Sequence, residues 1–353
     1  MANLNFLNLS KNRKRKLKTS LLILPLALML VWLGFKLDLG ETNLLDGFAR
    51  EIVVGQTKTS VNFGKNWLDK NFNWDSLDKN IFQVPERLNP RGLNLVFVSD
   101  EFENFEEFKN TAAGIAQGLR TVEPWKSYQD FNFFTVFNQD NSICQAKDEL
   151  GFAPTLKCSK KLIGLIQKLP LVKVKIIVVS RENFVSWANV TRFENSFVFY
   201  SLSKEKENDS FNKKIFWHEF AHGFGLRDET RSIIGMAGSA PARPEGPNCA
   251  PSLDLAKKWW GDLIKRQSQN LFFDHSANDV GFYFGCAGNE AYIRPTQQSL
   301  MNIQDFPGAE NYGPVSERYL KKMLDYCFSK KLYKISDDPK FFEQYPEFKE
   351  CLQ

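Results

Sequence analysis

Short apolar runs alternate with segments of helical spacing through the middle of the chain. Apolar runs bounded by turn-forming residues predict buried strands at residues 93–98, 131–137, 172–179 and 197–200. Apolar positions three or four residues apart predict helices at residues 105–119 and 162–171, the second ending near Pro170. This alternation predicts an α/β (α+β) domain with a mixed, twisted sheet.

The pattern becomes less regular after residue 200. Further helices are expected at residues 214–223 and 316–328, and the second of these is amphipathic. Residues 235–251 are rich in Gly, Ala, Pro and Arg, and this composition predicts a loop rather than a core element. Trp259 and Trp260 are expected to pack in the core.

The N-terminal segment combines positive charge with an uncharged apolar run. Residues 11–18 contain six Lys and Arg side chains, and residues 19–35 carry no charge. As a helix the apolar run would be about 25 Å long, which suffices to cross a bilayer core of about 30 Å if the flanking lysines extend to the surface. The charge asymmetry predicts a cytoplasmic tail at 1–18, a transmembrane anchor at 19–36 and a domain outside the cytoplasm.

A cleaved signal peptide is the alternative interpretation, and the protein would then be secreted. No small-x-small cleavage site follows Phe35, which favours the uncleaved anchor. Residues 37–89 are expected to form a juxtamembrane stalk, because Pro85 and Pro90 mark the start of the folded domain at 90–353.

The net charge of +5 comes from the basic tail, since the six cations at residues 11–18 leave the rest of the chain at about −1. The folded part therefore offers no electrostatic case for nucleic-acid binding. The sequence does not define an oligomeric state.

Six cysteines suit an exported, disulfide-bonded domain. Six cysteines allow 15 pairings, and the absence of any Cys-x-x-Cys argues against a four-cysteine zinc site. Proximity in the sequence suggests the pairs Cys144–Cys158, Cys249–Cys286 and Cys327–Cys351.

Two of the three histidines lie four residues apart in His218-Glu219-Phe220-Ala221-His222. Residues four apart share one face of a helix, so both imidazoles can bind a single cation. Glu219 would then act on the water that the cation carries, as in zinc peptidases with the His-Glu-x-x-His motif. The third histidine, His275, is expected to be a surface or core residue rather than a ligand.

Gly225 and Asp228 extend this motif. Metzincins continue with Gly and then His at these positions, whereas this chain has an aspartate at the second of them. The glycine permits the sharp turn that returns the chain to the metal. Two histidines and one carboxylate form an established catalytic zinc set, so Asp228 is the expected third ligand, with Glu229 as the alternative.

A methionine turn is the second metzincin feature. Ser299-Leu300-Met301-Asn302 resembles the turn that places a methionine beneath the metal, and Met236 is a rival closer to the helix. Tyr292 and Tyr312 are candidates for a donor to the oxyanion by analogy with metzincins, although a structural role is favoured for both.

These features together resemble the IgA-type metallopeptidases, a bacterial zinc-peptidase family of metzincin character, over roughly residues 90–325. The similar segments are the strand at 93–100, the helix at 105–122, the turn and strand at 123–136, the motif at 218–229, Pro247-Asn248-Cys249, Lys258-Trp259-Trp260 and Tyr292-Ile293-Arg294-Pro295. The loop from His222 to Asp228 is one residue shorter than the family form, and Thr230 replaces an aromatic residue.

The resemblance implies zinc-dependent cleavage of a protein or peptide substrate, without implying that the substrate is an immunoglobulin. Zn²⁺ would be held by His218, His222 and Asp228, with Glu219 as the general base. In metzincin architecture an edge strand pairs with extended substrate, and residues 197–200 are the candidate for it.

Two other hypotheses remain open at this point. One is a non-catalytic surface adhesion module on a peptidase fold, which the intact Glu219 disfavours. The other is a gluzincin with a glutamate ligand from a later helix, which Gly225 and residues 299–302 disfavour.

Overall fold

The computed structural model describes residues 76–353, except for 141–142, 148–153, 170, 172, 192–194, 203–208, 231–244, 265–278, 303–307, 330–332 and 353. These residues all belong to the compact unit Gln56–Gln353. The basic tail, the expected anchor at 19–36 and the stalk up to residue 75 lie outside the described residues. Within the described part, no helix has the length and apolar character needed to cross a membrane.

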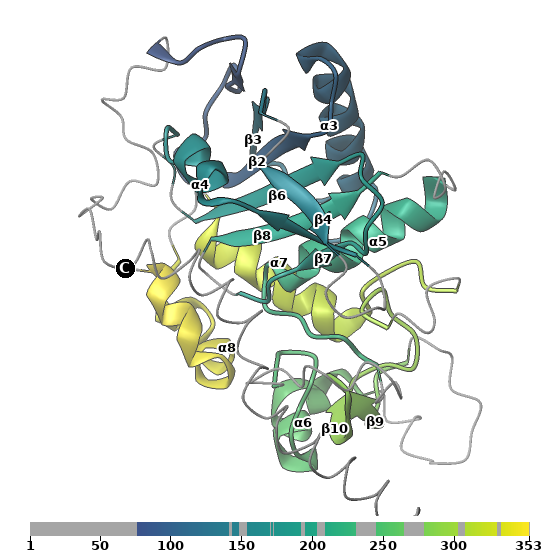
Figure 1. Ribbon diagram of the computed structural model, residues 1–353. Helices are drawn as coiled ribbons and strands as arrows, with labels where there is room; N and C mark the ends of the chain where they lie inside the picture. Colours follow the sequence, from purple (N-terminus) through teal and green to yellow (C-terminus); the bar gives the residue numbers. More distant parts are fainter. Residues whose placement is uncertain are drawn as a thin grey trace, which may run out of the picture. The chain divides into compact units, whose positions relative to one another are not determined.

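A six-stranded mixed sheet forms the centre of the domain (Figure 1). Its spatial order is β1 (Phe82–Gln83), β3 (Phe131–Val136), β2 (Leu93–Asp100), β6 (Val174–Ser180), β8 (Ser196–Ser201) and β7 (Trp187–Ala188). The four inner strands are parallel, and β1 and β7 pair antiparallel at the two edges. Every residue of β2, β6 and β8 is buried, as expected for parallel strands covered on both faces. The predicted mixed α/β sheet is therefore confirmed.

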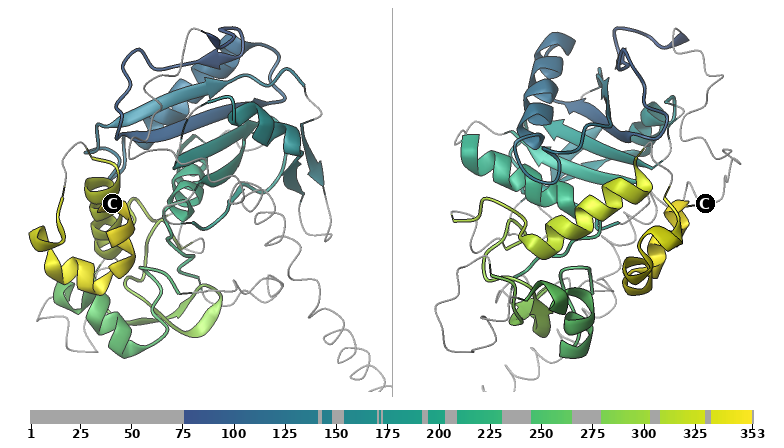
Figure 2. Two further views of the ribbon diagram at one scale, coloured as in Figure 1. Left: turned by 90° about the vertical axis from the view of Figure 1, so that its left-hand side faces the viewer. Right: turned by 180° about the vertical axis from the view of Figure 1, so that it is seen from behind.

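Helices cover the sheet on both sides. The helices are α3 (Phe105–Leu119), α4 (Lys160–Ile166), α5 (Asp209–His222), α6 (Leu253–Trp260), α7 (Pro314–Cys327) and α8 (Pro339–Gln344). In the view from behind, α3, α5 and α7 lie on the near side of the sheet (Figure 2), and α4 lies on the opposite side (Figure 1). The helix predicted at 105–119 is α3, and its N-cap Asn104 accepts a hydrogen bond from the Glu107 N–H at 2.9 Å.

Smaller elements complete the domain. They are the hairpins β4 (Cys144–Lys147) with β5 (Thr155–Cys158) and β9 (Tyr283–Cys286) with β10 (Asn289–Arg294), and the 3₁₀ helices η4 (Gly261–Leu263), η7 (Ile335–Asp337) and η8 (Pro346–Leu352). Trp260 is fully buried and Trp259 is partly buried, so both contribute to the core as predicted.

The prediction that residues 197–200 form the edge strand is wrong. Those residues belong to β8, which lies between β6 and β7. The true edge at this side is β7, where Trp187 pairs with Phe199 and Ala188 pairs with Val198. A two-residue strand has too few positions to produce an alternating pattern, so periodicity could not reveal it.

The three disulfides are the pairs that sequence proximity suggested. Cys144–Cys158 joins paired residues of β4 and β5, Cys249–Cys286 joins the segment before α6 to β9, and Cys327–Cys351 joins α7 to η8. The prediction that residues 235–251 form a loop outside the core needs correction at its end. Asn248, Cys249 and Ala250 are fully buried, and Ala250 exchanges backbone hydrogen bonds with Ile293.

Candidate metal and catalytic site

Aromatic packing fixes the position of helix α5, which carries the His-Glu-x-x-His motif. Phe220 is fully buried, and its ring centroid lies 5.0 Å from that of Trp125 and 5.2 Å from that of Phe224. The motif's polar side chains, those of His218, Glu219 and His222, are buried as well, and their ligand atoms lie within 4.8 Å of one another. The sequence thus places three potential metal-binding side chains together at the C-terminal end of α5.

Backbone carbonyl groups orient both imidazoles. The Nδ1 atom of His218 lies 2.8 Å from Leu300 O, and that of His222 lies 2.8 Å from Leu226 O. A carbonyl oxygen only accepts hydrogen bonds, so each Nδ1 carries the proton. In the neutral imidazole this leaves Nε2 with its lone pair available for a metal, and such Nδ1 contacts are typical of metal-binding histidines.

Asp228 completes a group of three electron-pair donors. The two Nε2 atoms are 3.2 Å apart, and Asp228 Oδ1 lies 3.0 Å from Nε2 of His218 and 3.5 Å from Nε2 of His222. Ligands at about 2.0–2.1 Å from a tetrahedral zinc are about 3.3 Å apart. The separations and the donor set of two imidazole nitrogens and one carboxylate oxygen therefore fit a zinc ion.

Charge dominates the protonation of this group. Burial raises the pKa of Asp228, but the neighbouring His222 and His218 outweigh burial and hold that pKa well below its usual range. Conversely, burial lowers the pKa of His222, but Asp228, Glu219 and the Leu226 carbonyl together raise it to about 9, so a metal would displace the Nε2 proton of His222 on binding. The aspartate is therefore ionised and available to a cation throughout the neutral range.

The turn from α5 to Asp228 depends on glycine and on Asn248. Gly225 adopts φ 92°, which glycine reaches at little cost, and its N–H donates to His222 O at 3.0 Å. Asn248 then accepts from the Arg227 N–H at 2.9 Å and donates to Arg227 O at 2.8 Å. The expected role of Gly225 in the turn agrees with its conformation. The role of Asn248 was missed, although the resemblance included Pro247-Asn248-Cys249.

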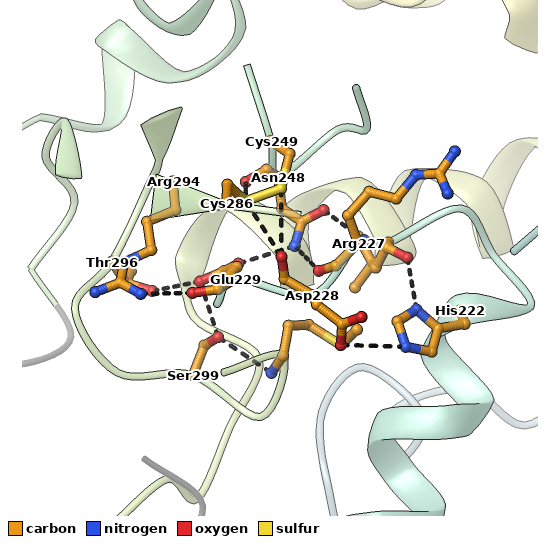
Figure 3. The surroundings of a disulfide bond; sticks show 12 residues. His222, Arg227, Asp228, Glu229, Asn248, Cys249, Cys286, Arg294, Thr296 and Ser299 are labelled. Atoms are coloured by element: carbon orange, nitrogen blue, oxygen red, sulfur yellow. Dashed lines mark hydrogen bonds and ion pairs between the residues drawn. A yellow bond between two sulfur atoms is a disulfide. The ribbon is translucent and has the colours of Figure 1, made fainter. Parts of the chain in front are cut away.

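Glu229, the alternative third ligand, is hydrogen bonded on the other side of the chain (Figure 3). Its Oε1 accepts from Asn248 Nδ2 at 3.0 Å, and its Oε2 accepts from Ser299 Oγ at 2.9 Å and Thr296 Oγ1 at 3.3 Å. Burial raises the pKa of Glu229 to about 7, against the opposing effect of these hydrogen bonds. Of the two adjacent carboxylates, Asp228 is the one that the fold brings to the histidines.

Glu219 lies between α5 and the edge strand β7. Its side chain is buried near the Ala188 backbone. Burial raises the pKa of Glu219 to about 7, although the nearby histidines act in the opposite direction. A carboxylate with a pKa near 7 can both take up and release a proton at neutral pH, as a general base and acid must.

The Ser299–Asn302 segment forms a turn beside the expected ligands. The Asn302 N–H donates to Ser299 O at 3.0 Å, and Met301 is fully buried. Leu300 O contacts His218 Nδ1, and Met301 O accepts from the Glu229 N–H at 2.7 Å. The turn thus contacts His218, an expected ligand, and Glu229, which follows the expected ligand Asp228. The rival Met236 lies outside the described residues.

The remaining candidates lie elsewhere. The Tyr312 hydroxyl donates to Trp217 O at 2.6 Å and accepts from Trp125 Nε1 at 3.2 Å in the buried core. Tyr292 packs against the Cys249–Cys286 disulfide. These contacts agree with the structural role favoured for both tyrosines. His275 lies outside the described residues.

A scan against protein-family models and a search of curated proteins found no match to this chain. The IgA-type metallopeptidase family therefore remains a resemblance carried by the residues named above.

Proposed function

We propose that the protein is a zinc-dependent metalloendopeptidase. The observation that supports this most is the convergence of His218 Nε2, His222 Nε2 and Asp228 Oδ1 within 3.5 Å, beside the buried Glu219. Nitrogen and carboxylate ligands in this combination suit zinc, and three protein ligands leave a coordination position for chemistry. Zinc supplies a water of lowered pKa and polarises the scissile carbonyl group.

The chain's own residues would move the protons. Glu219 accepts the proton of the attacking water and delivers it to the nitrogen of the scissile peptide bond, which then leaves as an amine. The backbone contacts of the two histidines keep their Nε2 atoms oriented toward the metal position. Each of these contacts is present before substrate binds, which reduces the reorganisation needed for reaction.

The substrate would be an extended segment of a protein lying along β7. This strand forms the edge of the sheet and contacts helix α5, which carries Glu219. An exposed strand edge binds extended peptides through main-chain hydrogen bonds. Three disulfides and the basic, then apolar, N-terminus support a domain that works outside the cytoplasm, anchored by residues 19–36.

The substitution Glu219→Gln tests the enzyme against a binding module. We expect the variant of the full chain to retain zinc, measured by elemental analysis, and to cleave casein about 10²–10⁴-fold more slowly. Equal cleavage by the variant and the wild type would exclude Glu219 as the general base. A wild type that holds zinc but cleaves neither casein nor a peptide library would favour the binding module.

A further inference from the structure

Glu229 is a buried carboxylate, and both of its oxygens accept hydrogen bonds from side chains. Asn248, Ser299 and Thr296 all donate to its carboxylate oxygens, and the side chain is fully excluded from solvent. Its backbone is bound too, because its N–H donates to Met301 O and its carbonyl accepts from Arg294 Nη1. Removing a carboxylate from water is costly, so an arrangement with three side-chain donors offsets much of that cost.

These partners come from two segments that also contact the metal-binding residues. Asn248 holds the backbone of Arg227, the residue before Asp228, through two hydrogen bonds. Ser299 begins the turn whose Leu300 carbonyl orients His218. Glu229 therefore links Asn248, which holds the backbone next to Asp228, to the turn that orients His218. Figure 3 shows its hydrogen bonds with Asn248 and Ser299.

The Cys249–Cys286 disulfide connects two segments that also hold Asp228 in place. Asn248 is followed directly by Cys249, which is bonded to Cys286, and the Ala287 N–H donates to Asp228 O at 2.7 Å. The main chain of Asp228 is thus bound on one side by the segment after the disulfide, while the Glu229 carboxylate binds the segment before it. These contacts hold the main chain of Asp228, while its side chain is directed at the histidines.

We propose that Glu229 is a positioning residue that sets the Asp228 carboxylate and the His218 ring for metal binding through Asn248 and Ser299. This inference rests on the proposed metal site. A carboxylate is suited to the task because both of its oxygens accept, whereas a glutamine amide would present N–H groups to one of the surrounding donors. Groups that orient metal ligands typically contribute 10–100-fold to metal affinity.

Glu229→Gln in the full chain provides the test, because the substitution keeps the size of the side chain. Zinc affinity would be measured by competition with a chelator, and the ligand geometry by the visible absorption spectrum of the Co²⁺-substituted protein. We expect zinc to bind 10–100-fold more weakly and the Co²⁺ spectrum to change. Asp100→Asn is the matched control, since Asp100 is also fully buried and accepts from a serine, Ser180. It should leave both readouts unchanged.

Zinc affinity and a Co²⁺ spectrum equal to those of the wild type in Glu229→Gln would overturn the positioning role. If that variant does not fold, Ser299→Ala and Thr296→Val each remove one donor, and the same comparison applies to them. Wild-type protein that binds no zinc would instead overturn the proposed function. The two failures are therefore distinguishable.

Discussion

The helix side and the loop side of the site are held in place by different forces. On the helix side, α5 is fixed by the aromatic cluster of Trp125, Phe220 and Phe224. On the loop side, the Ala287 N–H donates to the Asp228 carbonyl, and Asn248 forms two hydrogen bonds with the backbone of Arg227. The Cys249–Cys286 disulfide connects these two segments. Apolar packing sets the stability of the fold, whereas oriented polar contacts set the geometry of a ligand. Damage to the two sides should therefore have separable consequences.

The largest effect on stability is expected from the helix side. Phe220→Ala leaves a cavity in the aromatic cluster and should lower the free energy of unfolding by about 3–5 kcal/mol. Chemical denaturation monitored by circular dichroism would measure the loss. Phe211→Ala is the control on the same helix, because Phe211 is 42% exposed and should cost less than about 1 kcal/mol. Similar losses for the two variants would contradict the packing account.

The Cys249–Cys286 and Cys144–Cys158 disulfides allow an effect on stability to be separated from an effect on the metal site. Replacing Cys249 and Cys286 by serine should lower the free energy of unfolding by about 4 kcal/mol, and replacing Cys144 and Cys158 by about 3 kcal/mol, from the lengths of their loops. Only the first change lies beside Asp228, so only it should also weaken zinc binding, measured by chelator competition. Loss of zinc affinity in both pairs, or in neither, would contradict a local role for the Cys249–Cys286 bond.

Asp100 tests electrostatics away from the site. Burial raises the pKa of Asp100 from 3.8 to about 6, against the hydrogen bond from Ser180. The folded protein therefore holds this proton more tightly than the unfolded chain, and the contribution to stability is lost as pH rises from about 4 to about 6. Asp100→Asn should remove this loss and stabilise the protein at pH 7 by up to about 3 kcal/mol. Denaturation curves of both proteins at pH 4 and pH 7 provide the check; an equal difference at the two pH values would contradict it.

The smallest effect is expected at Gly114 in α3. A Cβ added there would meet no heavy atom within 4 Å, so alanine fits without a clash. Gly114→Ala should stabilise the protein by about 0.5–1 kcal/mol through helix propensity, with zinc binding unchanged. Gly223→Ala is the opposite case, because its Cβ would lie 2.6 Å from Ser196 Oγ and should destabilise the end of α5. A thermal shift assay would rank the two variants.

The sequence predicted the helix side of the molecule better than the loop side. Apolar runs and helical spacing located α3 and the inner strands because their burial leaves a regular apolar pattern. The His-Glu-x-x-His motif located α5, although that helix begins at Asp209 and not at the predicted residue 214. The spacing of His218, Glu219 and His222 follows from helix geometry alone. By contrast, the contacts of Asn248 with Arg227 and Glu229 join residues about 20 positions apart in irregular segments, where no period exists. The edge strand β7 was missed for the same reason.

The structure was also needed to tell which of Asp228 and Glu229 lies beside the histidines. Both residues are carboxylates that follow Gly225 within four positions, so chemistry and spacing alone left the alternative open. The donors that distinguish them, on Asn248, Thr296 and Ser299, lie about 20 to 70 residues away in the chain.

Zinc content of the full chain by elemental analysis, for wild type, His222→Ala and Asp228→Ala, tests the central claim most directly. We predict one zinc per wild-type chain and none in either variant, with casein cleavage lost in parallel. Zinc retained by Asp228→Ala would contradict the aspartate ligand, and zinc absent from the wild type would contradict the metallopeptidase itself.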